Sequence, residues 1–318
     1  MTKPYVCPRC GHRYSIKERN EDEFCSECEK RLIKWTNAKG LLRHAINELV
    51  DRDSFIKQIY SNVVVQENCP LTECDRCFAI HQFSRLSNFH HKPCFPPIGS
   101  SDKGQVLFVG SNPRCRRGTK DEDFYRHALS SLENFLQFSI DGRYEDSKGY
   151  PKWLFNDPHY RIHKNCLAEV DPSWALGQKS SVAEIFMCGS KDSNIFSDRR
   201  DYICAKEYLV KYIGLVKPEV IVSFGSLALQ WFQMRYRNDL KGNMKYLDGT
   251  VPKNYVGDPL LGGIADLHAC FSEVRINSGC TSTAMFSYHP SRMKNEVDLL
   301  KTFRFVMCSQ SDPLTKRK

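Results

Sequence analysis

The sequence predicts an α/β fold, a three-layer α/β/α sandwich around a four-stranded parallel central sheet. Short, almost continuously apolar runs, which are typical of strands buried on both faces, alternate with longer runs that have apolar residues at helical spacing. The 318 residues, of which 41% are hydrophobic, suffice for one large core and a small appendage. We therefore expect one α/β domain with a small N-terminal module.

Four strand-like runs are expected to form the sheet: QVLFVG (105–110), VAEIFMC (182–188), EVIVSFG (219–225) and TAMFSY (283–288). Helical patterns lie between them, at 124–138, 205–216 and 226–232. Parallel sheets of this kind bind their ligands at the carboxyl ends of the strands. Three of these ends carry chemically useful residues, in GSNP (110–113), Cys188 and HPS (289–291).

Two CxxC pairs open the chain, and their ligands would be Cys7, Cys10, Cys25 and Cys28. This spacing predicts a four-cysteine zinc ribbon over residues 1–35, in which bound Zn²⁺ replaces the core that so short a segment cannot build. Such a ribbon could bind DNA, RNA or protein. The apolar spacing from 41 to 60 then predicts a helical connector within 36–64.

A further CxxC in NCPLTECDRC has no second CxxC after it, so its partners must lie far along the chain. Cys188 ends a predicted strand, and Cys204 begins a predicted helix sixteen positions later, so two thiolates could face one site. Spacing alone does not distinguish zinc from iron. The candidates, including two that could replace Cys74, are Cys69, Cys74, Cys77, Cys94, Cys188 and Cys204.

The formal charge of +9 favours a polyanionic partner. Ligation by eight thiolates would lower it to roughly +5. Basic clusters at 114–118, 197–201, 291–295 and the C-terminal KRK fit phosphate contacts, although each also fits a solvated surface.

No run approaches the roughly 18 apolar residues of a membrane span, and the first residues lack the layout of a signal peptide. We therefore expect a cytoplasmic protein with no membrane association. In that compartment metal sites explain the fifteen cysteines better than disulfides do.

These motifs, in this order, resemble the uracil-DNA glycosylase superfamily. The resemblance is carried by LFVGSNP, by the two cysteines sixteen positions apart, by CAKEYLVKYIGLVKPEVIVSFGSLALQWF and by YHPS. It is closest to the family 4 branch and covers about residues 65–305, which implies a glycosylase-like domain at 65–308 and a basic flexible tail at 309–318. The aromatic-rich segment 141–180 lies outside it. The resemblance implies a structural [4Fe–4S] cluster on Cys74, Cys77, Cys188 and Cys204.

Hydrolysis of an N-glycosidic bond builds positive charge on the sugar and negative charge on the departing base, so the site needs a water-orienting group and an anion stabiliser. The resemblance implies that Asn112 positions the water and that His289 donates a hydrogen bond to the pyrimidine O2. Gly110 and Ser111 would line the base pocket. Family 4 has an acidic residue where this chain has Ser111, so the motif is a hybrid.

The same resemblance implies contacts with DNA. Pro290 and Ser291 would begin a loop that pinches the DNA backbone, and Arg292 or Met293 would fill the gap left by the extruded nucleotide. Arg114 would contact phosphate.

The flipped base also needs an aromatic platform. Phe124 lies near the position where relatives place a stacking phenylalanine, and Tyr125 is an equal rival. For either residue, simple packing in the core is an alternative role.

Glu184 interrupts an otherwise apolar strand, four residues before Cys188. Family 4 has an asparagine there that reads the uracil edge. An ionised carboxylate only accepts hydrogen bonds, as does the 4-position of uracil, whereas cytosine offers an amino group; a protonated glutamate could also donate to N3. We therefore expect a cytosine marked by a bulky 5-substituent, such as hydroxymethyl or a sugar on it, with uracil as the alternative.

Phages carry such modified cytosines, so an antiviral role is one hypothesis and DNA repair is the other. The segment 141–180 could supply room or a lid for the substituent. Two classes of function stay open. The first is a monofunctional DNA glycosylase, acting as a monomer and leaving an abasic site. The second is an inactive DNA- or RNA-binding protein that keeps the fold. The pairing of Asn112 with His289 favours the enzyme, and the missing acidic residue at Ser111 favours the binding protein.

Overall fold

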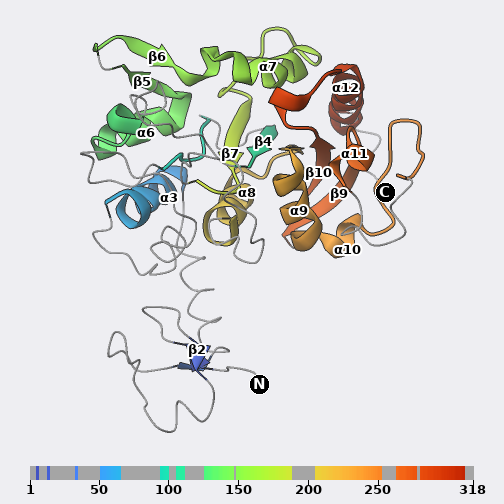
Figure 1. Ribbon diagram of the computed structural model, residues 1–318, viewed down its shortest axis with the longest axis horizontal. Coiled ribbons are helices and arrows are strands. Elements are labelled where there is room, and N and C mark those ends of the chain that lie inside the picture. Colours follow the sequence, from blue (N-terminus) through green and yellow to red (C-terminus); the bar gives the residue numbers. More distant parts are fainter. Residues whose placement is uncertain are drawn as a thin grey trace.

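A computed structural model describes residues 5–6, 13–14, 33–34, 51–65, 94–99, 105–111, 125–146, 148–187, 205–252, 263–277 and 280–311. Most of these residues form an α/β fold with a five-stranded, mostly parallel central sheet (Figure 1). The strand order is β7-β4-β8-β10-β9. The strands are β4 (Val106–Gly110), β7 (Ser180–Glu184), β8 (Val220–Phe224), β9 (Phe271–Asn277) and β10 (Cys280–Ser287).

The four strands expected from sequence are parallel neighbours, and the fifth, β9, corrects the predicted number of four. β9 pairs antiparallel with β10 at the edge of the sheet. Its residues alternate between buried Val274 and exposed Glu273 and Arg275. This alternation is typical of an edge strand with one solvent-exposed face. Parallel strands that are buried on both faces have continuous apolar runs instead.

The central strand β4 lies between β7 and β8, and all its residues before Gly110 are buried. The chain leaves β4 for β7 on one side and then crosses to β8 on the other, which makes the carboxyl end of β4 a topological switch point. Residues 94–99 cover the outer edge of β7, since Ile98 exchanges backbone hydrogen bonds of 2.8 and 2.7 Å with Val182.

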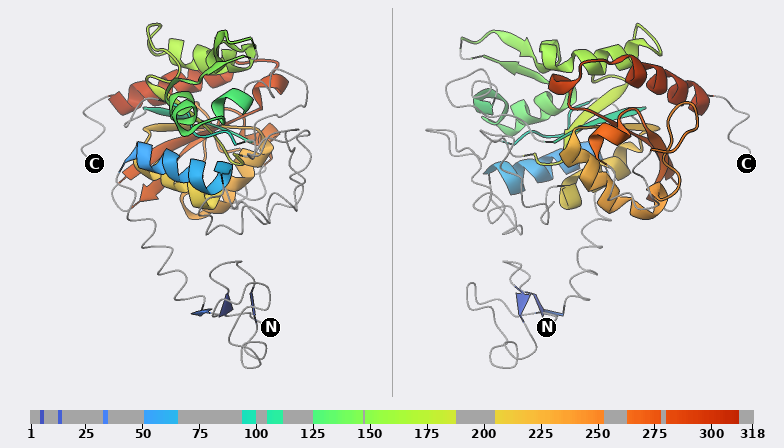
Figure 2. Two further views of the ribbon diagram at one scale, coloured as in Figure 1. Left: turned by 90° about the vertical axis from the view of Figure 1, so that its left-hand side faces the viewer. Right: turned by 45° about the vertical axis from the view of Figure 1, so that its right-hand side comes forward.

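Helices cover both faces of the sheet, with α3 and α8 on one side and α7 and α12 on the other (Figures 1 and 2). The helices and helical turns are α3 (Arg52–Ile59), η1 (Tyr60–Val65), α6 (Leu132–Asp141), η2 (Leu154–Asn156), η3 (Pro158–Tyr160), α7 (Arg161–Ala168), η5 (Ala205–Leu209), α8 (Val210–Val216), α9 (Ser226–Arg235), α10 (Arg237–Leu240), α11 (Ile264–Leu267), η7 (Pro290–Arg292) and α12 (Val297–Ser311).

In two helices, α3 and α6, the side chain of the N-cap residue accepts a hydrogen bond from the first turn. The carboxylate of Asp51 accepts from the backbone N–H of Ser54 at 2.7 Å and starts α3. The hydroxyl of Ser131 accepts from the backbone N–H of Asn134 at 3.1 Å and starts α6, which separates α6 from the helical turn at 125–128.

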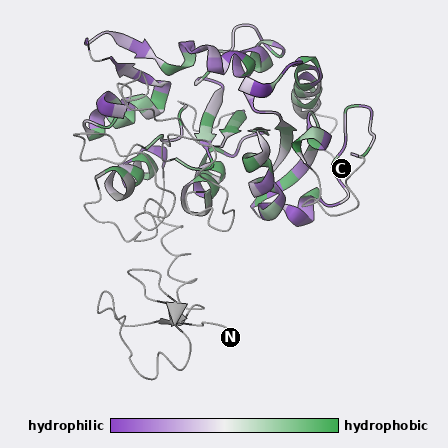
Figure 3. Cartoon of the chain, viewed as in Figure 1, coloured by the Kyte–Doolittle hydropathy of each residue, from purple (hydrophilic) through white to green (hydrophobic). Residues whose placement is uncertain are grey.

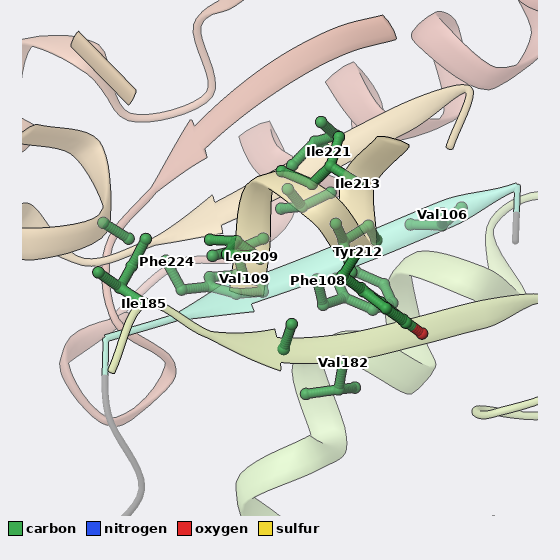
Figure 4. Close-up of a cluster of buried hydrophobic side chains, with 14 of the residues drawn as sticks. Val106, Phe108, Val109, Val182, Ile185, Leu209, Tyr212, Ile213, Ile221 and Phe224 are labelled. Carbon is green, nitrogen blue, oxygen red and sulfur yellow. The ribbon is translucent and has the colours of Figure 1, made fainter. Parts of the chain in front are cut away.

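Helix α3, which was expected as part of a connector, contributes to the core. Phe55 is fully buried, and its ring lies 6.0 Å from that of Tyr212 and 6.3 Å from that of Tyr208. Leu209, Tyr212 and Ile213 belong to the same buried cluster as the strand side chains (Figure 4).

The opposite face of β4 is covered through Phe108. Its ring stacks at 6.1 Å on Phe224 of β8 and at 6.4 Å on Phe303 of α12, and it meets the ring of His163 of α7 edge-on at 4.7 Å. Hydrophobic residues are concentrated in the strands and inner helix faces (Figure 3). Phe108 therefore joins the sheet to both helices of this layer.

The segment 141–180 contains a hairpin of β5 (Arg143–Glu145) and β6 (Pro151–Trp153), followed by η2, η3 and α7. A separate three-stranded antiparallel sheet contains β1 (Tyr5–Val6), β2 (Arg13–Tyr14) and β3 (Ile33–Lys34). Within the described part of the chain, no helix is long and apolar enough to cross a membrane.

We expect Phe108→Ala to lower the free energy of unfolding by about 3–5 kcal/mol, because it leaves a cavity between the sheet, α7 and α12. Urea denaturation followed by circular dichroism measures this change. Met234→Ala, which removes a side chain that is 52% exposed, is the control and should change stability by less than about 0.5 kcal/mol. Equal effects of the two substitutions would contradict this account of the core.

Candidate active site

Four parallel strands bring their carboxyl ends to one edge of the sheet. β4 ends at Gly110, β7 at Glu184 and β8 at Phe224, while β10 ends at Ser287, two residues before His289. This edge includes the topological switch point, where ligands bind in open α/β sheets. The candidate site is built there.

Glu184 folds its side chain over Gly110. The two residues are paired in the parallel ladder of β4 and β7. A Cβ on Gly110 would overlap Oε2 of Glu184 and would lie 2.8 Å from its Cδ and Oε1. A side chain at position 110 would therefore displace the carboxyl group of Glu184 from this place.

Glu184 is half-buried as a whole. Its Oε2 atom is buried and has no hydrogen-bond partner among the described residues. Burial raises the pKa of Glu184 from 4.5 to about 8, because the charged form loses its hydration. The carboxyl is therefore mostly protonated at neutral pH and carries one donor and one acceptor.

The segment 141–180 supplies Tyr160 next to Glu184. Tyr160 is buried, and its pKa is raised well above 10 by burial first and then by the negative charges of Glu184 and Asp157. Its ring lies 5.2 Å from that of His163, the first-turn histidine of α7. Segment 141–180 thus brings Tyr160 close enough to Glu184 for the charge of the carboxylate to raise the pKa of the phenol.

His163 is a buried neutral imidazole. Burial, followed by the nearby His159 and His289, lowers its pKa from 6.5 to about 3. It lies between the rings of Phe108 and Phe224, at 4.7 and 4.8 Å. The role of His163 is therefore to pack as an aromatic ring against Phe108 and Phe224.

His289 is oriented by the residue two positions after it. The backbone N–H of Ser291 donates to Nδ1 of His289 at 3.3 Å, and the Ser291 hydroxyl lies 2.8 Å from the same nitrogen. An N–H can only donate, so Nδ1 is the acceptor and Nε2 carries the ring proton. His289 is thus set up as an Nε2–H donor.

Gly225 lies close to both Ser111, at the end of β4, and His289. It has φ +88°, and a Cβ there would lie 3.4 Å from Oγ of Ser111 and 3.6 Å from Cβ of His289. Its backbone N–H donates to the carbonyl of Ser287 at 2.8 Å. Ser111 and His289 therefore flank the same glycine, which needs to be a glycine because of its positive φ.

The structure places five further predicted residues or their rivals. Tyr125 is fully buried in the hydrophobic core. Pro290 begins η7, Arg292 is exposed and Met293 packs partly buried against the core. Cys94 is fully buried.

The remaining predicted residues lie outside the described part of the chain. They are Asn112, Arg114, Phe124 and the nine metal-ligand candidates Cys7, Cys10, Cys25, Cys28, Cys69, Cys74, Cys77, Cys188 and Cys204.

Sequence reasoning did not assign Tyr160, His159 or His163, although all three border the site. They belong to one short stretch, HYRIH, whose aromatic and imidazole content is the only local signal. Their relation to Glu184 and His289 arises because η3 packs on η7 and α7 packs on α12.

No protein-family model matches this chain, and no curated protein matches it either. The resemblance to uracil-DNA glycosylases therefore rests on the sequence motifs alone.

The raised pKa of Glu184 has a consequence for stability. In the unfolded chain this group ionises near pH 4.5, whereas in the folded protein it keeps its proton up to about pH 8. Between these values the folded state binds the extra proton, so its stability falls as pH rises, by up to about 1.4 kcal/mol per pH unit. We expect Glu184→Gln to remove this slope in urea unfolding measured from pH 5 to pH 8.

The matched control is Glu273→Gln, which changes an exposed glutamate on β9 and should keep the wild-type pH dependence. An unchanged slope in Glu184→Gln would mean that Glu184 is ionised in the folded protein.

Proposed function

We propose that the protein is a monofunctional DNA glycosylase of the uracil-DNA glycosylase superfamily, which hydrolyses the N-glycosidic bond of a flipped-out pyrimidine and leaves an abasic site. The observation that carries the proposal is the placement of two residues at the carboxyl edge of one sheet: Glu184, whose pKa burial raises to about 8, and His289, whose Nδ1 accepts from Ser291 and leaves Nε2–H as a donor. The first can read a base, and the second can stabilise its departure.

His289 would act on the leaving base. As the glycosidic bond breaks, negative charge develops on the pyrimidine and is shared with O2. A neutral imidazole with its proton on Nε2 can donate to that oxygen without first giving up a proton, and Ser291 holds the ring in this form. Asn112, which follows Ser111 by one position, would orient the attacking water.

Glu184 would read the edge of the base. A neutral carboxyl can accept from the cytosine amino group and donate to N3, and it can equally accept from uracil N3–H and donate to O4. The ionised form still pairs with the amino group of cytosine but repels O4 of uracil. Glu184 can thus pair with the 4-amino group of cytosine whether it is protonated or ionised. It can pair with uracil only when it is protonated.

The substrate that we propose is a cytosine with a 5-substituent such as hydroxymethyl or its glucosylated form, as in phage DNA, which fits a role in antiviral defence. Excision of unmodified cytosine would damage every genome, so the substituent must be part of the recognition. The support from the structure is that segment 141–180 borders Glu184 through Tyr160.

Two metal centres complete the proposal. Ile185 and Phe186 continue the pairing of β7 with Gly110 and Ser111, and the carbonyl of Met187 accepts from the N–H of Phe95. η5 packs on β7 and begins with the buried Ala205, the residue after Cys204. The proposal includes a [4Fe–4S] cluster on Cys74, Cys77, Cys188 and Cys204 that would cross-link the fold. The short β1–β2 hairpin, whose connection carries Cys7 and Cys10, fits a zinc ribbon that could bind DNA or protein.

The test is an excision assay with labelled duplexes that contain one uracil, cytosine, 5-hydroxymethylcytosine or glucosylated 5-hydroxymethylcytosine, followed by alkali. We expect strand cleavage at the modified cytosines. His289→Ala should lower the single-turnover rate about 100-fold or more, because one anion-stabilising donor is lost. His127→Ala, a half-buried histidine beside Glu145, is the control and should keep the rate.

Each other outcome of this assay is informative. Cleavage of uracil DNA alone would contradict the proposed substrate, a 5-modified cytosine. Cleavage of no substrate would favour a nucleic-acid-binding protein that keeps the fold without the chemistry.

Metal analysis tests the two centres separately. The purified protein should contain about four iron atoms and about one zinc atom per chain. We expect Cys188→Ala to lose iron and the brown absorbance but keep zinc, and the matched variant Cys25→Ala to lose zinc but keep iron. Loss of both metals in both variants would contradict two independent sites.

A further inference from the structure

A second histidine lies beside His289 at the rim of the site. His159 is the middle residue of η3, and its ring centroid is 5.3 Å from that of His289, with the two rings inclined by 48°. η3 packs on η7, the turn that follows His289. His159 is exposed, whereas His289 is half-buried. Two imidazoles from distant segments therefore share the rim.

The position of His159 is fixed from its own turn. Oδ1 of Asp157 accepts from the backbone N–H of His159 at 2.8 Å. The ring of His159 meets that of the buried Tyr160 edge-on at 5.5 Å. Both His159 and His289 lie close enough to His163 to lower its pKa. The side chain thus has a defined place in a cluster of three imidazoles, of which it is the most exposed.

The exposure of His289 and His159 indicates which part of a bound nucleotide each would contact. In the proposed reaction the base lies against Glu184, and His289 lies at the bond between base and sugar. A group farther out than His289, next to η7, faces the sugar–phosphate backbone. An imidazole N–H is a donor in either protonation state and suits a phosphodiester oxygen.

We propose that His159 contacts a DNA phosphate next to the flipped nucleotide and so positions the strand against His289. This inference rests on the proposed glycosylase function. It assigns to segment 141–180 a role in holding the DNA backbone in addition to bordering Glu184. The partner is a phosphodiester group, so the contact carries no base specificity of its own.

The test separates binding from chemistry in the full-length protein. Binding is measured by fluorescence anisotropy with a duplex that contains a tetrahydrofuran abasic analogue, which the enzyme cannot cleave. His159→Phe keeps a ring against His289 and Tyr160 but removes the N–H donor. We expect its Kd to rise about tenfold, since a hydrogen bond to a charged group is lost, while the single-turnover excision rate at saturating enzyme changes less than about twofold.

Three further variants sharpen the result. His159→Lys restores a cationic donor and should return the Kd to within about threefold of the wild-type value. His289→Ala should show the opposite pattern, a large loss of rate with little change in Kd. His127→Phe, a half-buried histidine outside the cluster, should change neither quantity.

Wild-type affinity in His159→Phe would overturn the phosphate contact, as would a lower excision rate with an unchanged Kd. Absence of binding by the wild-type protein would overturn both the contact and the glycosylase function. If the wild-type protein binds but excises no base, the glycosylase function fails, while the Kd of His159→Phe still decides the contact.

Discussion

The close approach of Glu184 to Gly110 is the constraint on which the site depends. The parallel register of β4 and β7 sets the two residues side by side, and the missing Cβ of Gly110 lets the carboxyl group lie over the strand end. Enclosed there, the carboxyl keeps its proton and gains both a donor and an acceptor. Backbone pairing in the sheet therefore determines the chemical state of a side chain.

The rest of the site is assembled around this pair from segments that are distant in the chain. Gly225 joins Ser111 to His289 at the ends of β4, β8 and β10, while η3 and α7 add Tyr160 and His163 from outside the sheet. Phe108 fixes both outer helices to the central strand. A buried, well-packed sheet is a rigid base for groups that must meet one reacting bond.

The parts that the sequence predicts well are those with a local pattern. Continuous apolar runs located β4 and β8, and the HPS motif located His289. The edge strand β9 was not expected because its alternating residues, such as Val274 and Glu273, lack such a run. The place of Tyr160 beside Glu184 has no local signal, since it depends on tertiary packing of η3. The protonation of Glu184 likewise follows from enclosure and not from its residue type.

The lack of a cationic partner for Glu184 among the described residues has a consequence for recognition in the cell. An uncharged, enclosed group is not screened by dissolved ions, whereas contacts between exposed cations and DNA weaken steeply as ionic strength rises. Under the proposed function, changes in ionic strength would thus alter how long the protein stays on DNA, but not which base it accepts. The time spent on DNA would then depend on the salt concentration, whereas the choice of base would not.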